Sequence, residues 1–211
     1  MGIESDARFW DRASQKYAKG AIADQAGYER TLERTRALLG AGDRVLELGC
    51  GTGTTALRLA GHVQEYLATD ISTAMIVIAN EKRATDSIPN LVFRTATADA
   101  LTPEAVTFNA VLGFNYLHLV RDLPGTLRRI HALLADEGMF ISKTPCVGEM
   151  NPLVRLVLPA MRAIGKAPHA GVFRVSDLSE LIRAAGFDIV ATENHATKGD
   201  DKRPYIVARK R

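Results

Sequence analysis

This chain of 211 residues contains few cysteines, carries little net charge and lacks any long apolar run. The two cysteines, Cys50 and Cys146, form no Cys-x-x-Cys pair and no Cys/His cluster at metal-ligand spacing. Neither a disulfide framework nor a metal site is therefore expected. Lys and Arg number 27 and Asp and Glu 24, which leaves a formal net charge of +3. So small an excess does not predict a nucleic-acid surface, because such surfaces need clustered basic residues.

Segments that direct a chain into or across a membrane are also missing from the sequence. No run of about 18 uncharged apolar residues occurs, so no membrane-spanning helix is expected. The first residues are acidic and lack the apolar stretch of a signal peptide. Together with the scarcity of cysteine, these features favour a cytoplasmic protein.

The composition that remains is that of one globular domain. Hydrophobic residues make up 46% of the chain and charged residues 24%. The length suits one domain with a sizeable core, and no repeat, low-complexity tract or Pro/Gly/Ser linker divides it. We therefore expect residues 1–211 to form a single domain.

Two helices are expected in the first forty residues. Apolar and aromatic residues recur at helical spacing from Asp6 to Lys19, and a second stretch of this kind runs from Tyr28 to Leu39. Trp10 and Tyr17 are seven residues apart and so share one face of the first helix. This face forms an ordinary apolar stripe that can pack on the rest of the domain.

From residue 44 onward, predicted strands and helices alternate. The strands are expected at Arg44–Leu48, Glu65–Asp70, Leu91–Thr95, Phe108–Phe114, Gly138–Lys143, Phe187–Glu193 and Pro204–Arg209. The helices are expected at Thr54–Ala60, Thr73–Arg83, Leu123–Leu134 and Ser176–Ala185. Such alternation is typical of a parallel sheet with helices on both faces. The last two strands have no room for a helix between them, which favours an antiparallel pair at or near the sheet edge.

The most informative segment is the glycine-rich loop after the first of these strands. Gly49, Gly51 and Gly53 stand at every second position where the strand gives way to a helix. Glycine permits a positive φ and a close approach of a ligand to the backbone. The carboxyl ends of strands are also where open α/β sheets bind ligands. A loop of this kind can equally be a tight turn, so it does not establish a binding site by itself.

Acidic residues stand at or near the ends of three successive strands. Glu47 lies just before the glycine loop, Asp70 ends the second strand, and Asp99 follows the third. A carboxylate in the position of Asp70 suits ribose hydroxyls, and one in the position of Asp99 can accept from an exocyclic amine. The three together indicate a ligand with a ribose, an adenine and a positive charge, and they would repel a pyrophosphate. The third glycine also comes one position earlier than in the dinucleotide fingerprint G-x-G-x-x-G.

A resemblance to a known family rests on the segment Val45-Leu-Glu-Leu-Gly-Cys-Gly-Thr-Gly-Thr54. It resembles motif I of class I S-adenosylmethionine-dependent methyltransferases. Two later segments are similar to the small-molecule branch that includes the ubiquinone/menaquinone-biosynthesis methyltransferases: Phe108-Asn-Ala-Val-Leu-Gly-Phe-Asn-Tyr-Leu-His118 and Leu133-Leu-Ala-Asp-Glu-Gly-Met-Phe-Ile141. The resemblance covers nearly the whole chain. It implies an α/β, Rossmann-like three-layer sandwich with a seven-stranded, mostly parallel sheet ordered 3-2-1-4-5-7-6, strand 7 antiparallel, and with residues 1–40 as an N-terminal helical cap.

The resemblance also implies S-adenosylmethionine as cofactor and S-adenosylhomocysteine as product. The glycines would hold the methionine part, Asp70 and Asp99 would bind the ribose and the adenine amine, and Tyr17 would reach in from the cap, which would act as a lid. The residues expected at the cofactor are Tyr17, Glu47, Gly49, Gly51, Gly53, Asp70, Ile71, Met75, Asp99, Ala100 and Phe114.

Candidate catalytic residues follow the fourth strand, where the family places residues that face the methyl acceptor. His118 is a candidate general base, because the usual pKa of imidazole suits proton transfer near neutrality. It can equally be a histidine that packs or caps the following helix. Asn115 and Tyr116 are candidates for orienting the acceptor. The remaining histidines are expected on surfaces or at helix ends: His62, His131, His169 and His195.

Residues 145–174 are expected to form an insertion that roofs the acceptor pocket. An apolar helix is expected at Leu153–Ile164, with Arg155 and Arg162 on one face. Its apolar residues favour an apolar or aromatic acceptor, whereas the arginines allow an anionic group or loose contact with a membrane surface. A helix that only closes the core is the alternative interpretation.

The expected function is therefore transfer of a methyl group to O, N or C of a small, partly hydrophobic molecule. A nucleic-acid acceptor is not expected. Two other functions stay open. A nicotinamide-dependent oxidoreductase also uses a glycine loop and an acidic strand end, and a non-catalytic module that binds S-adenosylmethionine would keep the same cofactor residues.

Overall fold

The computed structural model describes residues 2–85, 88–102, 107–150, 157, 161–162, 165, 167–199 and 202–211. The strands are β1 (Arg44–Leu48), β2 (Glu65–Asp70), β3 (Leu91–Thr95), β4 (Phe108–Phe114), β5 (Leu134–Lys143), β6 (Phe187–Glu193) and β7 (Tyr205–Lys210). The α-helices are α1 (Ile3–Ala18), α2 (Gln25–Leu38), α3 (Thr54–Leu59), α4 (Thr73–Thr85), α5 (Leu123–Leu133) and α7 (Val175–Ala184). Short 3₁₀ helices occur at Ala60–His62, Ala98–Ala100, Leu117–Leu119 and Val147–Glu149.

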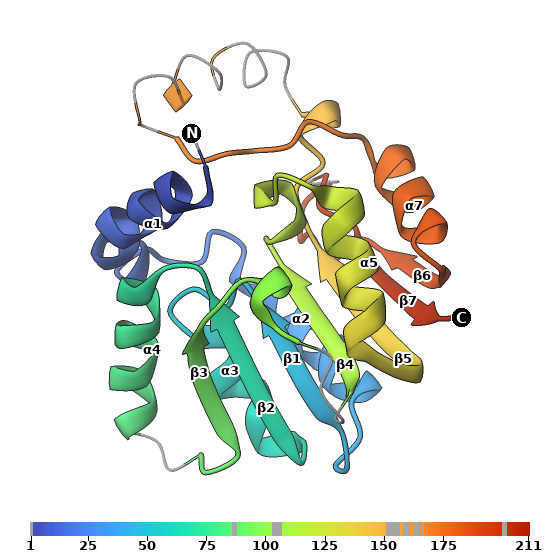
Figure 1. The fold of residues 1–211 in the computed structure, drawn as a ribbon, viewed down its shortest axis with the longest axis horizontal. Coiled ribbons are helices and arrows are strands. Elements are labelled where there is room, and N and C mark those ends of the chain that lie inside the picture. The colour runs from blue at the N-terminus through green and yellow to red at the C-terminus, as the bar shows by residue number, and fades with distance from the viewer. Residues whose placement is uncertain are drawn as a thin grey trace.

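The strands form one seven-stranded sheet in the order β3-β2-β1-β4-β5-β7-β6 (Figure 1). β7 runs antiparallel to both of its neighbours, and the other four strand pairs are parallel. The predicted fold class, strand order and antiparallel strand are confirmed. Because β1 to β5 run in one direction, their carboxyl ends share one edge of the sheet, and the start of β7 lies at that same edge.

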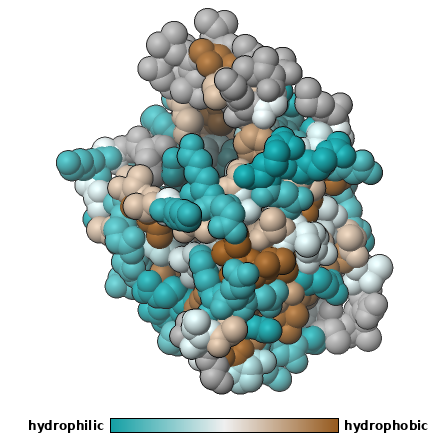
Figure 2. Space-filling model, turned by 90° about the vertical axis from the view of Figure 1, so that its left-hand side faces the viewer, coloured by the Kyte–Doolittle hydropathy of each residue, from teal (hydrophilic) through white to brown (hydrophobic). Residues whose placement is uncertain are grey.

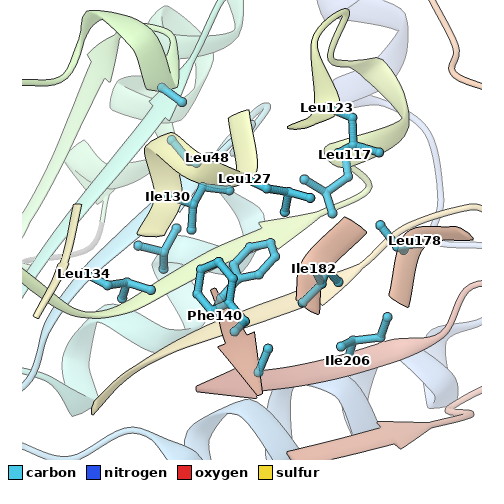
Figure 3. Packing of buried hydrophobic residues seen from close by; sticks show 14 of the residues in the cluster. Leu48, Leu117, Leu123, Leu127, Ile130, Leu134, Phe140, Leu178, Ile182 and Ile206 are labelled. Atoms are coloured by element: carbon cyan, nitrogen blue, oxygen red, sulfur yellow. The ribbon is translucent and has the colours of Figure 1, made fainter. Parts of the chain in front are cut away.

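Helices cover both faces of the sheet, and the side chains of the strands alternate between the two layers. In β1, Val45 packs in the cluster that includes residues of α2, α3 and α4, whereas Leu46 packs in the cluster with α5 and α7. Figure 3 shows the second cluster, in which Leu127 and Ile130 of α5 point toward Phe140 of β5. This period of two is what a strand buried on both faces requires.

The start of β5 differs from the prediction. The strand begins at Leu134 rather than Gly138, directly after α5. Its pairing with β4 shifts register between Phe108 and Ala110, and Glu137 has a φ of 60°. A bulge of this kind lets a strand continue through polar residues that look like a turn in the sequence.

The two N-terminal helices occupy different places. α2 contributes the fully buried Leu32 to the helical layer on one face of the sheet. α1 instead packs against α4 and lies across the ends of the strands (Figure 1). Two side chains fix α1 there: Asp11 accepts hydrogen bonds from Ser72 Oγ at 2.6 Å and from the backbone N–H of Ala74 at 3.1 Å, and Asp6 forms an ion pair with Arg121. Of the predicted cap, α1 is therefore the part that covers the strand ends.

Two further expectations concern helices. The helix predicted at Leu153–Ile164 lies almost wholly outside the described residues. Within the part of the chain that the structure describes, no helix has the length and apolar character needed to cross a bilayer.

Candidate functional site

A cavity of about 460 Å³ lies at the carboxyl ends of β1 to β4, with α1 on its other side. Four residues of α1 line it: Ile3, Asp6, Trp10 and Tyr17. This is the edge at which open α/β sheets bind ligands. The predicted site residues are therefore described by their position relative to this cavity.

The glycine loop adopts the backbone conformation for which glycine was expected. Gly49, Gly51 and Gly53 have φ values of 70°, 53° and 76°. A Cβ on Gly49 would stand 2.7 Å from Cδ2 of Tyr116, and a Cβ on Gly53 would stand 2.5 Å from Cζ of Phe93. Gly49 and Gly51 line the cavity, whereas Gly53 faces Phe93 and is not on the wall.

Asp70 connects the loop to the start of α4. Its Oδ2 accepts a hydrogen bond from the backbone N–H of Gly51 and its Oδ1 one from the backbone N–H of Ser72, both at 2.9 Å. Burial raises the pKa of Asp70 more than these two hydrogen bonds lower it. A carboxylate has about four acceptor sites. Asp70 also lines the cavity, so it retains capacity for the hydroxyls of a ligand.

The predicted adenine end lies where β2 and β3 finish. Ile71, Met75 and Asp99 all line the cavity. Asp99 is exposed within the 3₁₀ turn, and Arg129 of α5 holds this turn by donating to the backbone oxygens of Ala98 and Asp99. Ala100 is not on the cavity wall.

Glu47 lies beneath the loop and is not among the residues that line the cavity. It is only 3% exposed, and it accepts a hydrogen bond from Tyr66 Oη at 2.8 Å. Burial, with a smaller contribution from the charge of Asp70, raises the pKa of Glu47 to about 7 against the lowering effect of this bond. Its predicted nearness to the cofactor stays a prediction.

Tyr17 and Trp10 close the cavity from α1. Their rings meet edge to face, with centroids 6.2 Å apart. Tyr17 Cε1 lies 3.5 Å from the point that a Cβ on Gly51 would occupy. Partial burial and the charges of Asp70 and Glu47 raise the pKa of the Tyr17 phenol, so it stays protonated at neutral pH.

The three predicted catalytic residues also line the cavity, together with Phe114. Asn115 has a φ of 50°, and its backbone N–H donates to the carbonyl of Lys143 at 2.7 Å. The Tyr116 ring packs against Gly49, and burial together with the charges of Asp99 and Asp70 raises the pKa of its phenol. A left-handed residue at a strand end is a local strain that clusters at functional sites.

His118 is held by a residue that the sequence did not single out. Its Nδ1 lies 3.0 Å from Oγ1 of Thr144, and its backbone N–H donates to the same oxygen at 3.3 Å. Burial, followed by the charges of Arg203 and His169, lowers the pKa of His118 to about 4. The ring is therefore neutral at pH 7. Thr144 directly follows β5, and a polar residue at a strand end was the signal that could have found it.

Two arginines on the cavity wall were also missed. Arg121 forms a two-pronged ion pair with Asp6 of α1, at 2.8 and 3.0 Å. Arg203 stands just before β7, and because β7 is antiparallel its start lies at the edge where the other strands end. The cavity thus has the carboxylates of Asp70 and Asp99 near β2 and β3 and guanidinium groups near β4 and β7.

One expectation about the histidines was wrong. His195 is buried, not at a surface or a helix end. Its ring stacks on Tyr205 with centroids 4.4 Å apart, and its nitrogens lie 3.0 Å from Thr31 Oγ1 and 2.9 Å from Glu193 Oε2. This cluster joins α2 to the C-terminal strands, away from the cavity. Among the described residues, no group of three or more His, Cys, Asp or Glu side chains is placed to hold a metal ion.

The sheet order, the glycine loop after β1 and the acidic residue that ends β2 are those of class I S-adenosylmethionine-dependent methyltransferases. The chain matches the family described as "Methyltransferase domain" over residues 17–192. It belongs to that family.

Individual relatives differ in the activity that their names state. The chain is 34% identical over 153 residues to the mitochondrial arginine-hydroxylase NDUFAF5 of Danio rerio. This match covers 70% of this chain and 46% of the relative. It is 35% identical over 103 residues to a ubiquinone biosynthesis O-methyltransferase of Methylocella silvestris, covering 49% of this chain and 40% of the relative. The chain therefore spans less than half the length of each of these two relatives.

Solved structures share the fold over almost the whole chain. The complex of DhpI with SAH matches with a TM-score of 0.76 and 20% identity, covering 99% of this chain and 96% of that one. The magnesium protoporphyrin IX methyltransferase of Synechocystis PCC 6803 with bound SAH matches with a TM-score of 0.71 and 18% identity, covering 98% and 95%.

Proposed function

We propose that this chain transfers the methyl group of S-adenosylmethionine to an O, N or C atom of a small, partly hydrophobic molecule. One observation supports this above the others. A single cavity is lined by Gly49 and Gly51, by the carboxylates of Asp70 and Asp99, and by His118, which follows β4. It would thus offer places to a cationic nucleoside and to a second, smaller molecule.

The cofactor would supply the activated methyl group. The residues of the chain would bind the cofactor and the acceptor, align them and exclude water. Asp70 would accept from the ribose hydroxyls, while Gly49 and Gly51 let the methionine part approach the backbone. Tyr17 and Trp10 would cover the bound cofactor from α1. Alignment of this kind accounts for much of the rate in a transfer between two bound molecules.

His118 would take the proton of an O–H or N–H acceptor. For this, Nδ1–H must donate to Thr144 Oγ1, which leaves the lone pair of Nε2 for the acceptor. A pKa of about 4 makes His118 a weak base. A weak base is sufficient here, because an acceptor hydroxyl becomes far more acidic as its new bond to carbon forms. Thr144 is in this reading a positioning residue.

A labelled-methyl assay tests the proposal. The protein is incubated with S-adenosylmethionine carrying a labelled methyl group and with panels of phenols, quinols, amines and carboxylates. We expect transfer to at least one class, with turnover lowered by roughly 10²-fold or more in His118→Ala and with unchanged affinity for S-adenosylhomocysteine. Equal turnover in wild type and variant would assign His118 to packing.

The same assay, together with measurements of ligand binding, distinguishes the competing functions. Binding of S-adenosylhomocysteine without transfer to any acceptor would favour a non-catalytic module. Tight binding of a nicotinamide dinucleotide without binding of S-adenosylhomocysteine would favour an oxidoreductase. The name of the zebrafish relative adds hydroxylation of arginine as a candidate, for which the product would gain oxygen in place of the label.

A further inference from the structure

A second, smaller recess of about 150 Å³ adjoins the main cavity. It lies between α1 and a group made of Arg162, Gly165 and residues 167–169, and it shares Asp6 and Arg121 with the main cavity. The Asp6–Arg121 ion pair therefore forms the partition between the two. None of the residues predicted to bind the cofactor lines this recess.

The walls of the recess carry a strong excess of positive charge. Four arginines line it against the single carboxylate of Asp6: Arg8, Arg12, Arg121 and Arg162. Arg8 and Arg12 are one helical turn apart on α1, so their side chains lie on the same face. Neither makes a hydrogen bond or an ion pair with any residue that the structure describes, whereas Asp6 engages only Arg121. Neither of these two guanidinium groups thus has an ion-pair partner within the described residues.

His169 is the remaining titratable group at the recess. His169 lies at the recess with its Nδ1 3.0 Å from Nη2 of Arg162. Burial and the charges of Arg162 and Arg121 lower the pKa of His169, while Asp6 acts in the opposite direction. His169 also hydrogen-bonds to the backbone of Val120, so its ring is held on both sides and positions Arg162 at the recess.

The size and lining of the recess define the ligand. Phe9, Ala167 and Pro168 add apolar surface beside the guanidinium groups. The space is too small for a nucleoside, but it suits one planar or tetrahedral oxyanion. Guanidinium groups bind carboxylate and phosphate oxygens through paired N–H donors. The recess thus combines a shape, a charge and donors for a single anionic group.

We propose that the recess binds the anionic group, a carboxylate or phosphate, of the methyl acceptor, whose reacting atom lies beyond Arg121 in the main cavity. This inference rests on the proposed methyl transfer and narrows its substrate to an acid. The face of the molecule toward α1 and α4 is mostly hydrophilic with small hydrophobic patches (Figure 2), which favours a small dissolved acid over a lipid surface as the source of the anion.

A binding experiment tests the recess independently of methyl transfer. The protein is saturated with S-adenosylhomocysteine and titrated calorimetrically with inorganic phosphate and with benzoate. We expect saturable binding of at least one anion, weakened about tenfold or more in Arg8→Gln/Arg12→Gln, because hydrogen bonds to charged groups are lost. Lys16→Gln/Lys19→Gln is the matched control, since it removes two positive charges at the end of α1 outside the recess. No saturable binding, or equal binding by the double variant, would overturn the proposal.

A substrate comparison then ties the recess to the acceptor. Each aromatic acid that accepts the labelled methyl group is paired with its neutral amide. We expect the acid to have the lower KM in the wild type, and the double variant to raise that KM about tenfold with little change in kcat, as the loss of uniform binding requires. Equal KM values for acid and amide in the wild type would overturn the proposal. Anion binding without methylation of any acceptor would instead contradict the proposed function.

A vesicle experiment tests whether the anion that the arginines bind is instead the headgroup of a membrane lipid. Wild type and double variant are sedimented with vesicles of neutral lipid and of neutral lipid mixed with phosphatidylserine. Cosedimentation of the wild type that the double variant loses, with no binding of phosphate or benzoate, would assign the arginines to a membrane surface and overturn the acceptor subsite.

Discussion

At the scale of single residues, Asp70 combines a structural and a predicted ligand-binding role. Its two carboxylate oxygens hold the backbone N–H groups of Gly51 and Ser72, and the same group lines the cavity. The glycine loop and the start of α4 are thereby fixed by the group that is predicted to receive the ribose. A substitution of Asp70 should therefore affect ligand affinity both directly and through the loop.

We expect Asp70→Ala to weaken binding of S-adenosylhomocysteine at least tenfold, about 1.4 kcal/mol, because charge-assisted hydrogen bonds to the ribose are lost. Titration calorimetry measures the affinity, and circular dichroism checks that the variant is folded. Asp70→Asn preserves the shape of the side chain and should show a loss of the same sign. Unchanged affinity in both variants would refute the assignment.

Glu47 and His118 give the stability of the fold opposite dependences on pH. The pKa of Glu47 is raised from 4.5 to about 7, so between these values the folded state holds more protons than the unfolded state, and the free energy of unfolding falls as pH rises. The pKa of His118 is lowered from 6.5 to about 4, so in that window the unfolded state holds more protons, and the free energy of unfolding rises with pH.

These opposed effects predict how two variants differ from the wild type. From about pH 5 to about pH 6.5, the free energy of unfolding should rise more steeply with pH in Glu47→Gln than in wild type. In His118→Gln its slope with pH should be lower than in wild type. Urea unfolding at several pH values measures both slopes. Parallel profiles for the three proteins would contradict the burial of these two groups.

Among the structural elements, the glycine loop allows the cost of backbone strain to be distinguished from the cost of a steric clash. Gly51 and Gly53 both have positive φ, but a Cβ on Gly51 would only touch Tyr17 at 3.5 Å, whereas one on Gly53 would stand 2.5 Å from Phe93 and 2.9 Å from Cβ of Ala79. Gly51→Ala should cost about 1 kcal/mol from the left-handed backbone alone. Gly53→Ala should cost roughly 2–4 kcal/mol, because overpacking is added.

Chemical denaturation of the two variants measures this difference, and Gly51→Ala serves as the control for backbone strain. Equal losses would show that the contact with Phe93 relaxes freely. The expected order also explains why Gly53 is needed although it does not line the cavity: it lets α3 begin against β3.

Strand positions were the part of the fold most open to prediction. Arg44–Leu48 and Leu91–Thr95 are short apolar runs bounded by turn residues, and their limits agree with β1 and β3. The early start of β5 could not be predicted, because Asp136 and Glu137 look like a turn and only the bulge opposite Phe108 keeps them in the strand. Local pattern indicates where a strand can form, but pairing decides where it begins.

The candidate site was predictable to a similar degree. Asp70 and Asp99 follow from the rule that ligands bind at strand ends. Thr144 and Arg203 did not follow, because their place depends on which strands lie beside β4 and on the direction of β7. His195 was misplaced for the same reason: its burial comes from Tyr205 and Thr31, which are distant from it along the chain.

At the scale of the whole molecule, the sheet order determines the electrostatic character of the cavity. β2 and β3 lie at one side of β1 and bring Asp70 and Asp99, while β4 and β7 lie at the other and bring Arg121 and Arg203. A cationic cofactor would therefore be drawn to the side of the cavity near β2 and β3.

Ligand binding should be visible in the stability of the entire domain. S-adenosylhomocysteine at about 100 times its Kd should stabilise the protein by about 2.7 kcal/mol. For a chain of this size, that corresponds to a rise in Tm of roughly 5–10 °C. A thermal-shift experiment measures it, with NADH at the same concentration as the comparison. A shift with NADH alone would contradict the cofactor assignment.

The attachment of α1 has a kinetic consequence. The backbone N–H of Ala74, in the first turn of α4, finds its acceptor in Asp11 of a different helix. If spent cofactor leaves past α1, as we expect, that N–H would lose its partner and the Asp6–Arg121 pair would part as well. The bonds that would shelter the reaction would then also slow the exchange of cofactor, and we expect cofactor release to set an upper limit on turnover.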